Sequence, residues 1–324
     1  MRCLRPFALL LILAVPSVGR PYFNNQEAPE SLRDLKNIQK ALQESLTKTR
    51  AATVCLEIGE GSGSGVIISE DGLVLTAAHV SGGVDQDIVV VMEDGRKLRG
   101  ISLGLNSETD AAMLQITDPG PFPFVELDED DSFKLGDWVF ALGHSGGFDK
   151  ERGINVRVGR LVRQADSTVQ SDCLLIGGDS GGPLFDIEGK LIAIHSRVGG
   201  SKEESMHVPI REFQRGWEEM SEGKFMGEGG FAKKPVPGSA FLGVVLEEKE
   251  GGALEVREIY PESIADTTGI KVGAILLELN GEVVSGESSF LEALDKKGVG
   301  ESVVIKWSYQ EEVIEKKIKL GARP

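Results

Sequence analysis

The chain has 324 residues, of which 40% are hydrophobic and 27% charged, so it is long enough for two modest globular domains. Its formal net charge of −16 argues against nucleic acid and anionic membrane surfaces as partners. Three cysteines are too few for a disulfide scaffold. The composition is that of a globular protein rather than a disordered or membrane-spanning one.

Residues 1–19 have the pattern of a secretory signal peptide. Arg2 and Arg5 precede an apolar run of about ten residues, which is too short to span a bilayer well, and the small residues SVG follow. A short buried helix is the alternative. Cys3 lies before the apolar run, which disfavours a lipid anchor. We expect an exported protein without a stable membrane anchor, whose net charge becomes −18 once the two arginines are removed.

The N-terminal segment, residues 20–50, contains an amphipathic pattern over residues 29–46. Its apolar side chains recur every three or four residues, which predicts a helix. They are Leu32, Leu35, Ile38, Leu42 and Leu46. Two roles remain open: packing on the helix's own domain, or contact with another subunit.

Residues 51–222 change to short apolar runs separated by Gly, Asp, Asn and Ser. The runs include TVCLEI, LVLTAAHV, DIVVVM, AAMLQI, WVFALG and LIAIHS. Many short strands with turn signals predict an all-β barrel or sandwich. Cys55 and Cys173 lie in such runs, where buried free thiols are the commoner outcome. Residues 210–222 predict a closing helix.

The C-terminal third begins with a Gly-, Lys- and Pro-rich stretch, residues 223–240, which predicts a linker. Residues 241–321 then return to strand patterns. Two helical stretches interrupt them, around Pro261–Ala265 and Ser288–Lys297. This arrangement predicts a small α+β module.

Three separated motifs carry candidate chemistry. A serine hydroxyl becomes a good nucleophile only when a histidine accepts its proton and a carboxylate orients that histidine. His79 lies in TAAHV, Asp110 in TDAAMLQI and Ser180 in GGDSGGPL. Taken singly, each has a structural reading, as a strand-end histidine, a turn cap or a loop. Together they predict a catalytic triad.

The glycines around Ser180 fit the same chemistry. A tetrahedral intermediate needs backbone N–H groups aimed at its oxyanion, and glycine permits the necessary loop conformations. We expect the N–H groups of Gly178 and Ser180 to donate, within a candidate oxyanion hole of Gly178, Asp179 and Ser180. The glycine-rich stretch at 61–65 is expected to supply tight turns nearby. No motif for phosphate or metal binding is present in the sequence, so we expect no cofactor and no metal.

TAAHV, TDAAMLQI and GDSGGPL, in this order, resemble a trypsin-like serine protease of the HtrA/DegP type with one C-terminal PDZ domain. The resemblance covers roughly residues 50–321 and includes SGSGVIIS before TAAHV. It implies a mainly β fold: a chymotrypsin-like double β-barrel of six strands each, with the triad in the cleft between, followed by a small α+β PDZ domain. It also implies Ser180 as nucleophile, His79 as general base and acid, and Asp110 as the group that orients His79.

The resemblance also implies a P1 pocket built by the segment before Ser180 and by the strand after it. Leu175 and Val198 match positions that line that pocket, and both are aliphatic. We therefore expect a preference for Val, Ala or Leu-type side chains at P1. The sequence departs from the family here, because His-Ser-Arg at 195–197 replaces a stretch that is commonly Asn-Thr-Ala. Glu204 is also placed where it could alter the preference.

Within 241–321 the PDZ-like pattern implies capture of an extended peptide C-terminus at a sheet edge. Phe241, Leu242, Gly243 and Val244 match the carboxylate-binding loop. Phe290 and Leu294, one helical turn apart, would flank the groove. The alternative is that these two side chains belong to the core of a small domain.

Asp179 is the second departure from the family pattern, since HtrA-type proteases usually have asparagine there. In chymotrypsin-type enzymes the aspartate pairs with a new amino terminus after zymogen cleavage. A buried unpaired charge is costly, so Asp179 needs a partner. We predict that one of four nearby arginines pairs with it and orders the loop. The candidates are Arg157, Arg160, Arg163 and Arg197.

The sequence thus favours an exported, ATP-independent serine endopeptidase that cleaves unfolded or misfolded proteins in the periplasm or outside the cell. Its expected partners are unfolded polypeptides and peptide C-termini, not nucleic acid. The resemblance implies a homo-oligomer, a trimer or a multiple of it. The alternative function is a chaperone or peptide-binding adaptor with weak or conditional proteolysis.

Overall fold

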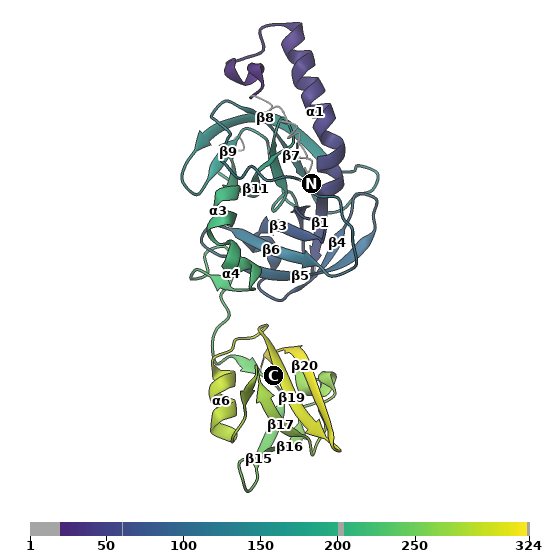
Figure 1. The fold of residues 1–324 in the computed structure, drawn as a ribbon, viewed down its shortest axis with the longest axis vertical. Helices are drawn as coiled ribbons and strands as arrows, with labels where there is room; N and C mark the ends of the chain where they lie inside the picture. Colours follow the sequence, from purple (N-terminus) through teal and green to yellow (C-terminus); the bar gives the residue numbers. More distant parts are fainter. Residues whose placement is uncertain (1–19, 60, 200–203, 323–324) are drawn as a thin grey trace, which may run out of the picture.

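A computed structural model describes residues 20–59, 61–199 and 204–322. The predicted signal peptide lies outside these residues. Figure 1 shows a larger part, which carries helix α1 along one side, and a smaller C-terminal part joined to it by a single connecting segment. The larger part contains the predicted site, and its two barrels position that site.

Helix α1 (Leu32–Ala52) follows a 3-10 turn, η1 (Tyr22–Asn25). It begins where Ser31 caps it, since the Ser31 hydroxyl accepts from the Asp34 N–H at 3.2 Å. The helix starts three residues later than predicted and runs six residues further. Ile38 and its neighbours on that face pack on the core of the larger part, whereas Leu32 and Leu35 are more than half exposed. The helix therefore packs on its own domain along only part of its apolar face.

Six antiparallel strands close the first barrel in the order β1-β2-β3-β6-β5-β4, because β5 pairs with β6 and β4 with β1. Their bounds are β1 Thr53–Ile58, β2 Gly61–Ile67, β3 Leu73–Ala77, β4 Asp87–Val91, β5 Lys97–Asn106 and β6 Ala111–Ile116. The short helix α2 (Ala78–Ser81) follows β3 directly. Strand ends of this barrel carry the histidine and the aspartate of the predicted triad.

The second barrel closes in the order β10-β11-β12-β9-β8-β7. Its strands are β7 Trp138–Gly143, β8 Asn155–Gln164, β9 Val169–Ser171, β10 Pro183–Asp186, β11 Leu191–Val198 and β12 Ser205–Pro209. The candidate nucleophile lies on the loop between β9 and β10. The expectation of a mainly β fold with two six-stranded barrels is confirmed.

The cores of the barrels are apolar and contain both thiols. Cys55 and Cys173 are free and buried, as predicted, and burial raises the pKa of Cys55 to about 11 and of Cys173 to about 12. The predicted closing helix is two short helices, α3 (Ile210–Arg215) and α4 (Trp217–Ser221), separated at Gly216.

The segment predicted as a linker, residues 223–240, is partly built into the first barrel. Strand β13 (Phe225–Met226) pairs in parallel with the end of β5. The Phe231 N–H donates to the Ser107 carbonyl at 2.6 Å, and the Phe231 ring packs beside Ala78 and Leu105. The first half of the segment is therefore fixed against the turn that precedes Asp110.

The C-terminal module has its own core, in which Trp307 is 1% exposed. Its main sheet runs β15-β16-β17-β19-β20, with β18 paired to β17 and a separate β14–β21 pair. The elements are β14 Ala240–Phe241, β15 Val244–Glu248, β16 Leu254–Ile259, α5 Ile264–Thr268, β17 Ile275–Leu279, β18 Glu282–Val283, α6 Glu287–Asp295, β19 Ser302–Tyr309, β20 Glu312–Lys319 and β21 Gly321–Ala322. Both predicted helices are present; α5 begins and ends three residues later than predicted, and α6 begins one residue earlier and ends two residues earlier.

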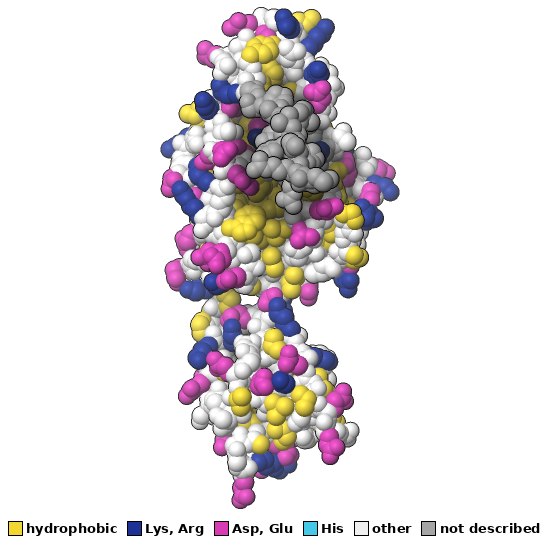
Figure 2. Space-filling view, viewed as in Figure 1, with side chains coloured by type: hydrophobic (Ala, Val, Ile, Leu, Met, Phe, Trp, Pro, Cys, Tyr) yellow, Lys and Arg dark blue, Asp and Glu magenta, His cyan; other side chains and the backbone are white. Residues whose placement is uncertain are grey.

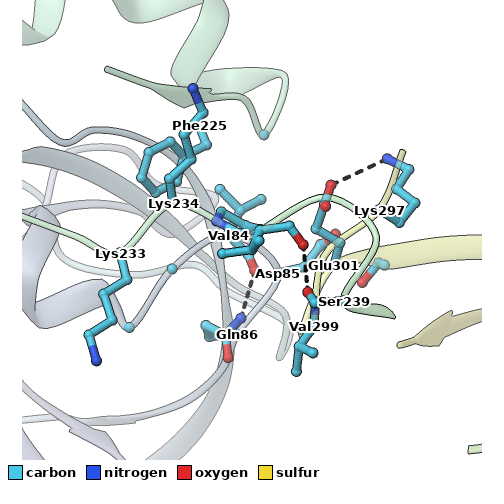
Figure 3. A pocket seen from close by; sticks show the side chains of 17 residues that line it. Val84, Asp85, Gln86, Phe225, Lys233, Lys234, Ser239, Lys297, Val299 and Glu301 are labelled. Atoms are coloured by element: carbon cyan, nitrogen blue, oxygen red, sulfur yellow. Dashed lines mark hydrogen bonds and ion pairs between the residues drawn. The ribbon is translucent and has the colours of Figure 1, made fainter. Parts of the chain in front are cut away.

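A hollow of about 590 Å³ lies where the loop at 82–86, the connecting segment and the module meet. Figure 3 shows Asp85 and Gln86 across from Ser239, Val299 and Glu301 in this hollow. Two lysines of β20 reach across: Lys317 bonds Asp85 at 2.7 Å and Lys319 bonds Gln86 at 2.9 Å. None of the predicted triad residues lines the hollow.

Figure 2 shows acidic and basic side chains mixed over one face of both parts, with hydrophobic side chains between them. Among the described residues, no helix combines the length and apolar character needed to cross a bilayer.

Candidate active site

His79 is held where a strand of the first barrel becomes a helix. Strand β3 ends at Ala77, and His79 is the second residue of α2. Asp110 fixes this junction from the backbone side: its carbonyl accepts from the Ala78 N–H and its Oδ1 accepts from the His79 N–H, both at 3.1 Å. The imidazole remains about one-third exposed, so it is anchored at its base and accessible at its tip.

Asp110 lies immediately before β6 with a fully buried side chain. Its φ of 67° places it in the left-handed region, which aspartate tolerates better than most residues. Both carboxylate oxygens lie 3.0 Å from His79 Nδ1. The carboxylate therefore selects the tautomer with the proton on Nδ1 and leaves the Nε2 lone pair available as a base.

Ser196 connects Ser180 to the His79–Asp110 pair by hydrogen bonds. The Ser196 hydroxyl donates to Asp110 Oδ2, and the Ser196 carbonyl accepts from the Ser180 hydroxyl at 3.4 Å. Ser180 therefore lies beside the His79–Asp110 pair, but its hydroxyl is turned toward the Ser196 carbonyl rather than bonded to His79. Catalytic hydrogen bonds are often long or misaligned before substrate binds. The sequence singled out Ser196 only as a departure from the family and not as a link within the site.

Two backbone N–H groups beside Ser180 are free to stabilise an oxyanion. Within the described residues, neither the Gly178 nor the Ser180 N–H donates a hydrogen bond. The Asp179 N–H, by contrast, donates to the Ile176 carbonyl at 3.1 Å. Within the candidate oxyanion hole, Asp179 therefore holds the loop, while Gly178 and Ser180 remain the predicted donors.

Gly178 is required by the loop's close packing. Its φ is +95°, and a Cβ there would lie 2.5 Å from both the Gly146 nitrogen and the His144 carbonyl oxygen. Real Cβ atoms do not approach backbone that closely, so only glycine fits without moving one of the two segments.

The glycine-rich stretch at 61–65 is part of strand β2 and not a set of tight turns as expected. It runs against the nucleophile loop. The Ser64 N–H donates to the Ser180 carbonyl at 2.8 Å, and the Ser64 hydroxyl donates to the Gly178 carbonyl at 2.8 Å. The same hydroxyl accepts from the His144 N–H at 2.9 Å. Ser64 therefore ties the loop of the second barrel to the first.

Asp179 is fully buried and paired with Arg157, which confirms the prediction of an arginine partner. Arg157 Nη1 lies 3.0 Å from Asp179 Oδ2. The two groups form an ion pair, but Nη1 does not have the geometry of a hydrogen-bond donor to this oxygen. Oδ1 accepts from the Ser145 hydroxyl at 2.6 Å and Oδ2 from the Ile176 N–H at 2.9 Å.

Two of the other candidate arginines have different contacts. Arg160 stacks on Trp138 with 4.5 Å from its guanidinium carbon to the ring centroid, and Arg197 stacks on Phe231 at 5.0 Å. Arg163 is exposed at the far end of β8.

Two buried histidines form a pair, and the backbone of one of them bonds the loop that carries Ser180: the His195 carbonyl accepts from the Gly181 N–H at 2.8 Å, and the His195 N–H donates to the Gly182 carbonyl at 2.7 Å. His195 Nε2 lies 3.2 Å from the Leu142 carbonyl, the two Nδ1 atoms of His195 and His207 lie 3.0 Å apart, and His207 Nε2 lies 2.8 Å from the Ser171 hydroxyl. One proton on each ring satisfies every contact, so both rings are neutral. Burial lowers the pKa of His207 to about 3 and, together with the neighbouring His207, holds the pKa of His195 well below its usual value.

The two predicted pocket residues lie in different surroundings. Leu175 is 6% exposed and packs in the core of the second barrel, whereas Val198 is 49% exposed near the end of β11. Burial gives Leu175 a structural role there. The preference for small aliphatic P1 side chains stays a prediction.

In the C-terminal module, residues 241–244 turn from β14 into β15. Gly243 has a φ of +90°, and a Cβ there would lie 2.2 Å from the Ser263 Cβ, so this loop requires glycine. Strand β15 is an edge strand of its sheet. Leu242, Phe290 and Leu294 are at most 9% exposed within the module's core. Phe290 and Leu294 thus lie in the module's core, as the alternative expects, and their place beside a peptide groove stays a prediction.

Within the described residues, no group of three or more His, Cys, Asp or Glu side chains is placed to hold a metal ion. The chemistry available at this site is that of a serine hydroxyl, an oriented imidazole and two backbone N–H groups.

Residues 63–194 match the family model of the trypsin-like peptidase domain. A probable periplasmic DegP-like serine endoprotease from Halomonas elongata is 31% identical over 253 residues, which cover 75% of this chain and 53% of that protein. A protein of the same description from Ectopseudomonas mendocina is 33% identical over 244 residues, covering 68% and 48%. The chain spans about half the length of these curated relatives.

Among solved structures, the serine endoprotease from Yersinia pestis superposes with a TM-score of 0.51 at 22% identity. The superposition covers 87% of this chain and 98% of that one. At this identity the likeness bears on the fold alone, and it agrees with the double barrel.

Proposed function

We propose that this chain, whose residues 63–194 belong to the trypsin-like peptidase family, is an exported, ATP-independent serine endopeptidase that cleaves unfolded or misfolded proteins. One observation carries the proposal: both oxygens of the buried Asp110 carboxylate lie 3.0 Å from His79 Nδ1, with the Ser180 hydroxyl linked to the same carboxylate through Ser196. A structural histidine or an isolated loop serine would not require this arrangement.

In the proposed mechanism the Ser180 hydroxyl turns from the Ser196 carbonyl toward His79 and attacks the scissile carbonyl carbon. His79 Nε2 takes the hydroxyl proton, and Asp110 stabilises the resulting imidazolium. The negative oxygen of the tetrahedral intermediate accepts hydrogen bonds from the Gly178 and Ser180 N–H groups. His79 then gives its proton to the leaving amine. Water attacks the acyl-enzyme while His79 takes its proton, and His79 returns that proton to the Ser180 oxygen as the product acid leaves.

The descriptions of similar proteins support the reaction and the location that we propose. The similar proteins are described as periplasmic serine endoproteases, which supports a periplasmic or extracellular location for this chain. Unfolded polypeptides can present the extended backbone that a protease cleft needs. A homo-oligomer, a trimer or a multiple of it, completes the proposal.

We also propose that the C-terminal module is a PDZ domain that captures peptide C-termini. The unpaired edge of β15 and the glycine-dependent loop at 241–244 support a strand-addition site with a carboxylate at its end. A fluorescent peptide with a free carboxylate should bind more tightly than its amidated twin, and equal binding of the two would contradict this role.

The enzyme proposal is tested with a fluorophosphonate probe, which labels only an activated serine. Wild-type protein should be labelled and should digest denatured casein, while Ser180→Ala should do neither and remain folded by circular dichroism. Absence of labelling in the wild type, even with a peptide activator, would favour the chaperone or adaptor function instead.

A further inference from the structure

The loop that carries Ser180 is fixed by a buried cluster outside the triad. Its members are Asp179, which is fully buried, Arg157 on β8 and Ser145 after β7. The Arg157 side chain is 19% exposed and spans the cluster: Nη1 lies 3.0 Å from Asp179 Oδ2, and Nη2 donates to the Ser145 hydroxyl at 2.9 Å.

The oxygens at the centre of this cluster all accept or donate hydrogen bonds, whereas Arg157 Nη1 has no hydrogen-bond partner among the described residues and contributes its charge. The Ser145 oxygen donates to Asp179 Oδ1 and accepts from Arg157 and from Asn155, the latter at 3.0 Å. Asp179 Oδ2 accepts from the Ile176 N–H as well as facing the guanidinium. A carboxylate with these partners is stable in the interior, whereas the same carboxylate without its cation would be costly to bury.

The cluster controls the backbone that provides the oxyanion donors. The Asp179 side chain accepts from the Ile176 N–H, and the Asp179 N–H donates back to the Ile176 carbonyl. These two bonds close the segment 176–179 into one rigid turn, and the free Gly178 N–H lies within it. The free Ser180 N–H belongs to the peptide unit that follows Asp179.

We propose that Arg157 is a positioning residue: its guanidinium, held against Asp179 and Ser145, keeps the Gly178 and Ser180 N–H groups in the orientation that binds the oxyanion. The positive charge comes from within the folded chain, so the loop is set without a new amino terminus released by proteolysis. This inference rests on the proposed function and names what prepares that site for catalysis.

The test compares Arg157→Met, which removes the charge, with Arg157→Lys, which keeps it. Arg163→Met is the matched control, because Arg163 lies on the same strand and is exposed. The measurements are kcat and KM on fluorescent casein and the rate of fluorophosphonate labelling.

Loss of oxyanion donors typically lowers kcat by about 10²- to 10³-fold. We expect the kcat of Arg157→Met to decrease by this factor, with KM changed less than threefold. The kcat of Arg157→Lys should be at least tenfold higher than that of Arg157→Met, and Arg163→Met should match the wild type. A folded Arg157→Met protein with wild-type kcat would overturn the inference.

A double variant keeps the test valid if Arg157→Met does not fold. Arg157→Met combined with Asp179→Asn leaves no buried charge unpaired, and asparagine can still accept from Ser145. If Arg157 and Asp179 act as a pair, the activity of the double variant exceeds the value obtained by multiplying the losses of Arg157→Met and Asp179→Asn. If Arg157→Met is unfolded, the comparison is with Asp179→Asn alone, and the double variant must be the more active of the two. Strictly multiplicative losses, or in the latter case no gain over Asp179→Asn, would overturn the inference.

Failure of the inference is distinguishable from failure of the proposed function. An inactive, unlabelled wild type removes the enzyme proposal, and the variants then carry no comparison. An active wild type with an equally active, folded Arg157→Met protein removes only the role of Arg157.

Discussion

The two barrels contribute to the candidate site in different ways. The first barrel places His79 and Asp110 at the ends of adjacent strands, and short direct bonds join them. The second barrel presents Ser180 on a loop, and a buried ion pair and a neutral histidine pair hold that loop. Ladder hydrogen bonds of the sheet fix the first half, whereas the second half depends on side chains gathered from distant parts of the chain.

This contrast teaches that the acid–base half is built into the fold, while the nucleophile half has to be assembled. A change at His79 or Asp110 in the first barrel should therefore affect proton transfer, while a change at Ser64, which bonds the loop that carries Ser180, should also affect that loop. A change in the second should affect loop geometry, and through it both the oxyanion donors and the nucleophile.

Asp110→Asn should produce the largest effect and confine it to the first half. The asparagine amide would favour the wrong imidazole tautomer, and such a change lowers kcat by about 10⁴-fold in a serine protease. Casein digestion measures it, with circular dichroism as the check on folding. A loss of less than tenfold would mean that His79 does not depend on this carboxylate.

Gly178→Ala should displace the loop that carries Ser180 and leave the His79–Asp110 contact unchanged. The new Cβ would meet backbone at 2.5 Å, so the loop must shift, and we expect kcat to fall by about 10²- to 10³-fold. Gly177→Ala is the matched control, since a Cβ there has nothing within 4 Å. Equal activities of the two variants would contradict the assignment of the Gly178 N–H.

Ser196→Ala tests the residue that bonds both Asp110 of the first half and Ser180 of the second half. It removes a hydrogen bond to the buried Asp110 carboxylate, and we expect a decrease in kcat of about tenfold, in line with hydrogen bonds to charged groups. Ser196→Thr retains the hydroxyl and should recover most of the activity. If the threonine variant is as impaired as the alanine variant, the hydroxyl is not the group that matters.

Acid should weaken the second half more than the first. Burial keeps His195 and His207 neutral in the folded state, with pKa values below 6.5, so the unfolded chain binds more protons as the pH falls below 6.5. Each such histidine costs the folded state about 1.4 kcal/mol per pH unit below 6.5. Asp186, whose pKa burial raises from 3.8 to about 6, acts in the opposite direction between those values but is outnumbered.

Thermal unfolding at several pH values between 8 and 5 measures this loss of stability. We expect the melting temperature to fall as the pH drops below 6.5, and to fall less steeply in His207→Gln, which removes one of the two rings. A melting temperature that rises on acidification would contradict the neutral histidine pair.

Local sequence was enough to predict much of this organisation. The strand periods and turn signals predicted an all-β barrel or sandwich, and the family resemblance carried by TAAHV, TDAAMLQI and GDSGGPL implied the double barrel and the residues that meet at Asp110. Each strand pattern and each motif is itself a run of residues close together in the chain, where periodicity is informative.

Contacts between residues that lie far apart in the chain could not be predicted from the sequence. Four arginines were equally eligible as the partner of Asp179, and only folding brings Arg157 to it. Nothing in the sequence pointed to the contacts of Ser64, Ser145 and Ser196, because a serine's role depends on which backbone group or carboxylate lies opposite. The glycines at 61–65 predict tight turns, but they lie in strand β2, where Gly63 lets the strand pass close to the loop that carries Ser180.

The parallel pairing of β13 with β5 also shortens the connection between the two parts of the molecule. With residues 225–232 fixed on the first barrel, and with Gly238 and Ser239 hydrogen-bonded to the C-terminal module, the free tether is residues 233–237, which reach about 18 Å at most when fully extended. A polypeptide held by the C-terminal module would therefore remain near Ser180 at an effective concentration in the millimolar range. Weak capture would then suffice for efficient cleavage, and the length of this tether would set which segments of a bound chain are cut.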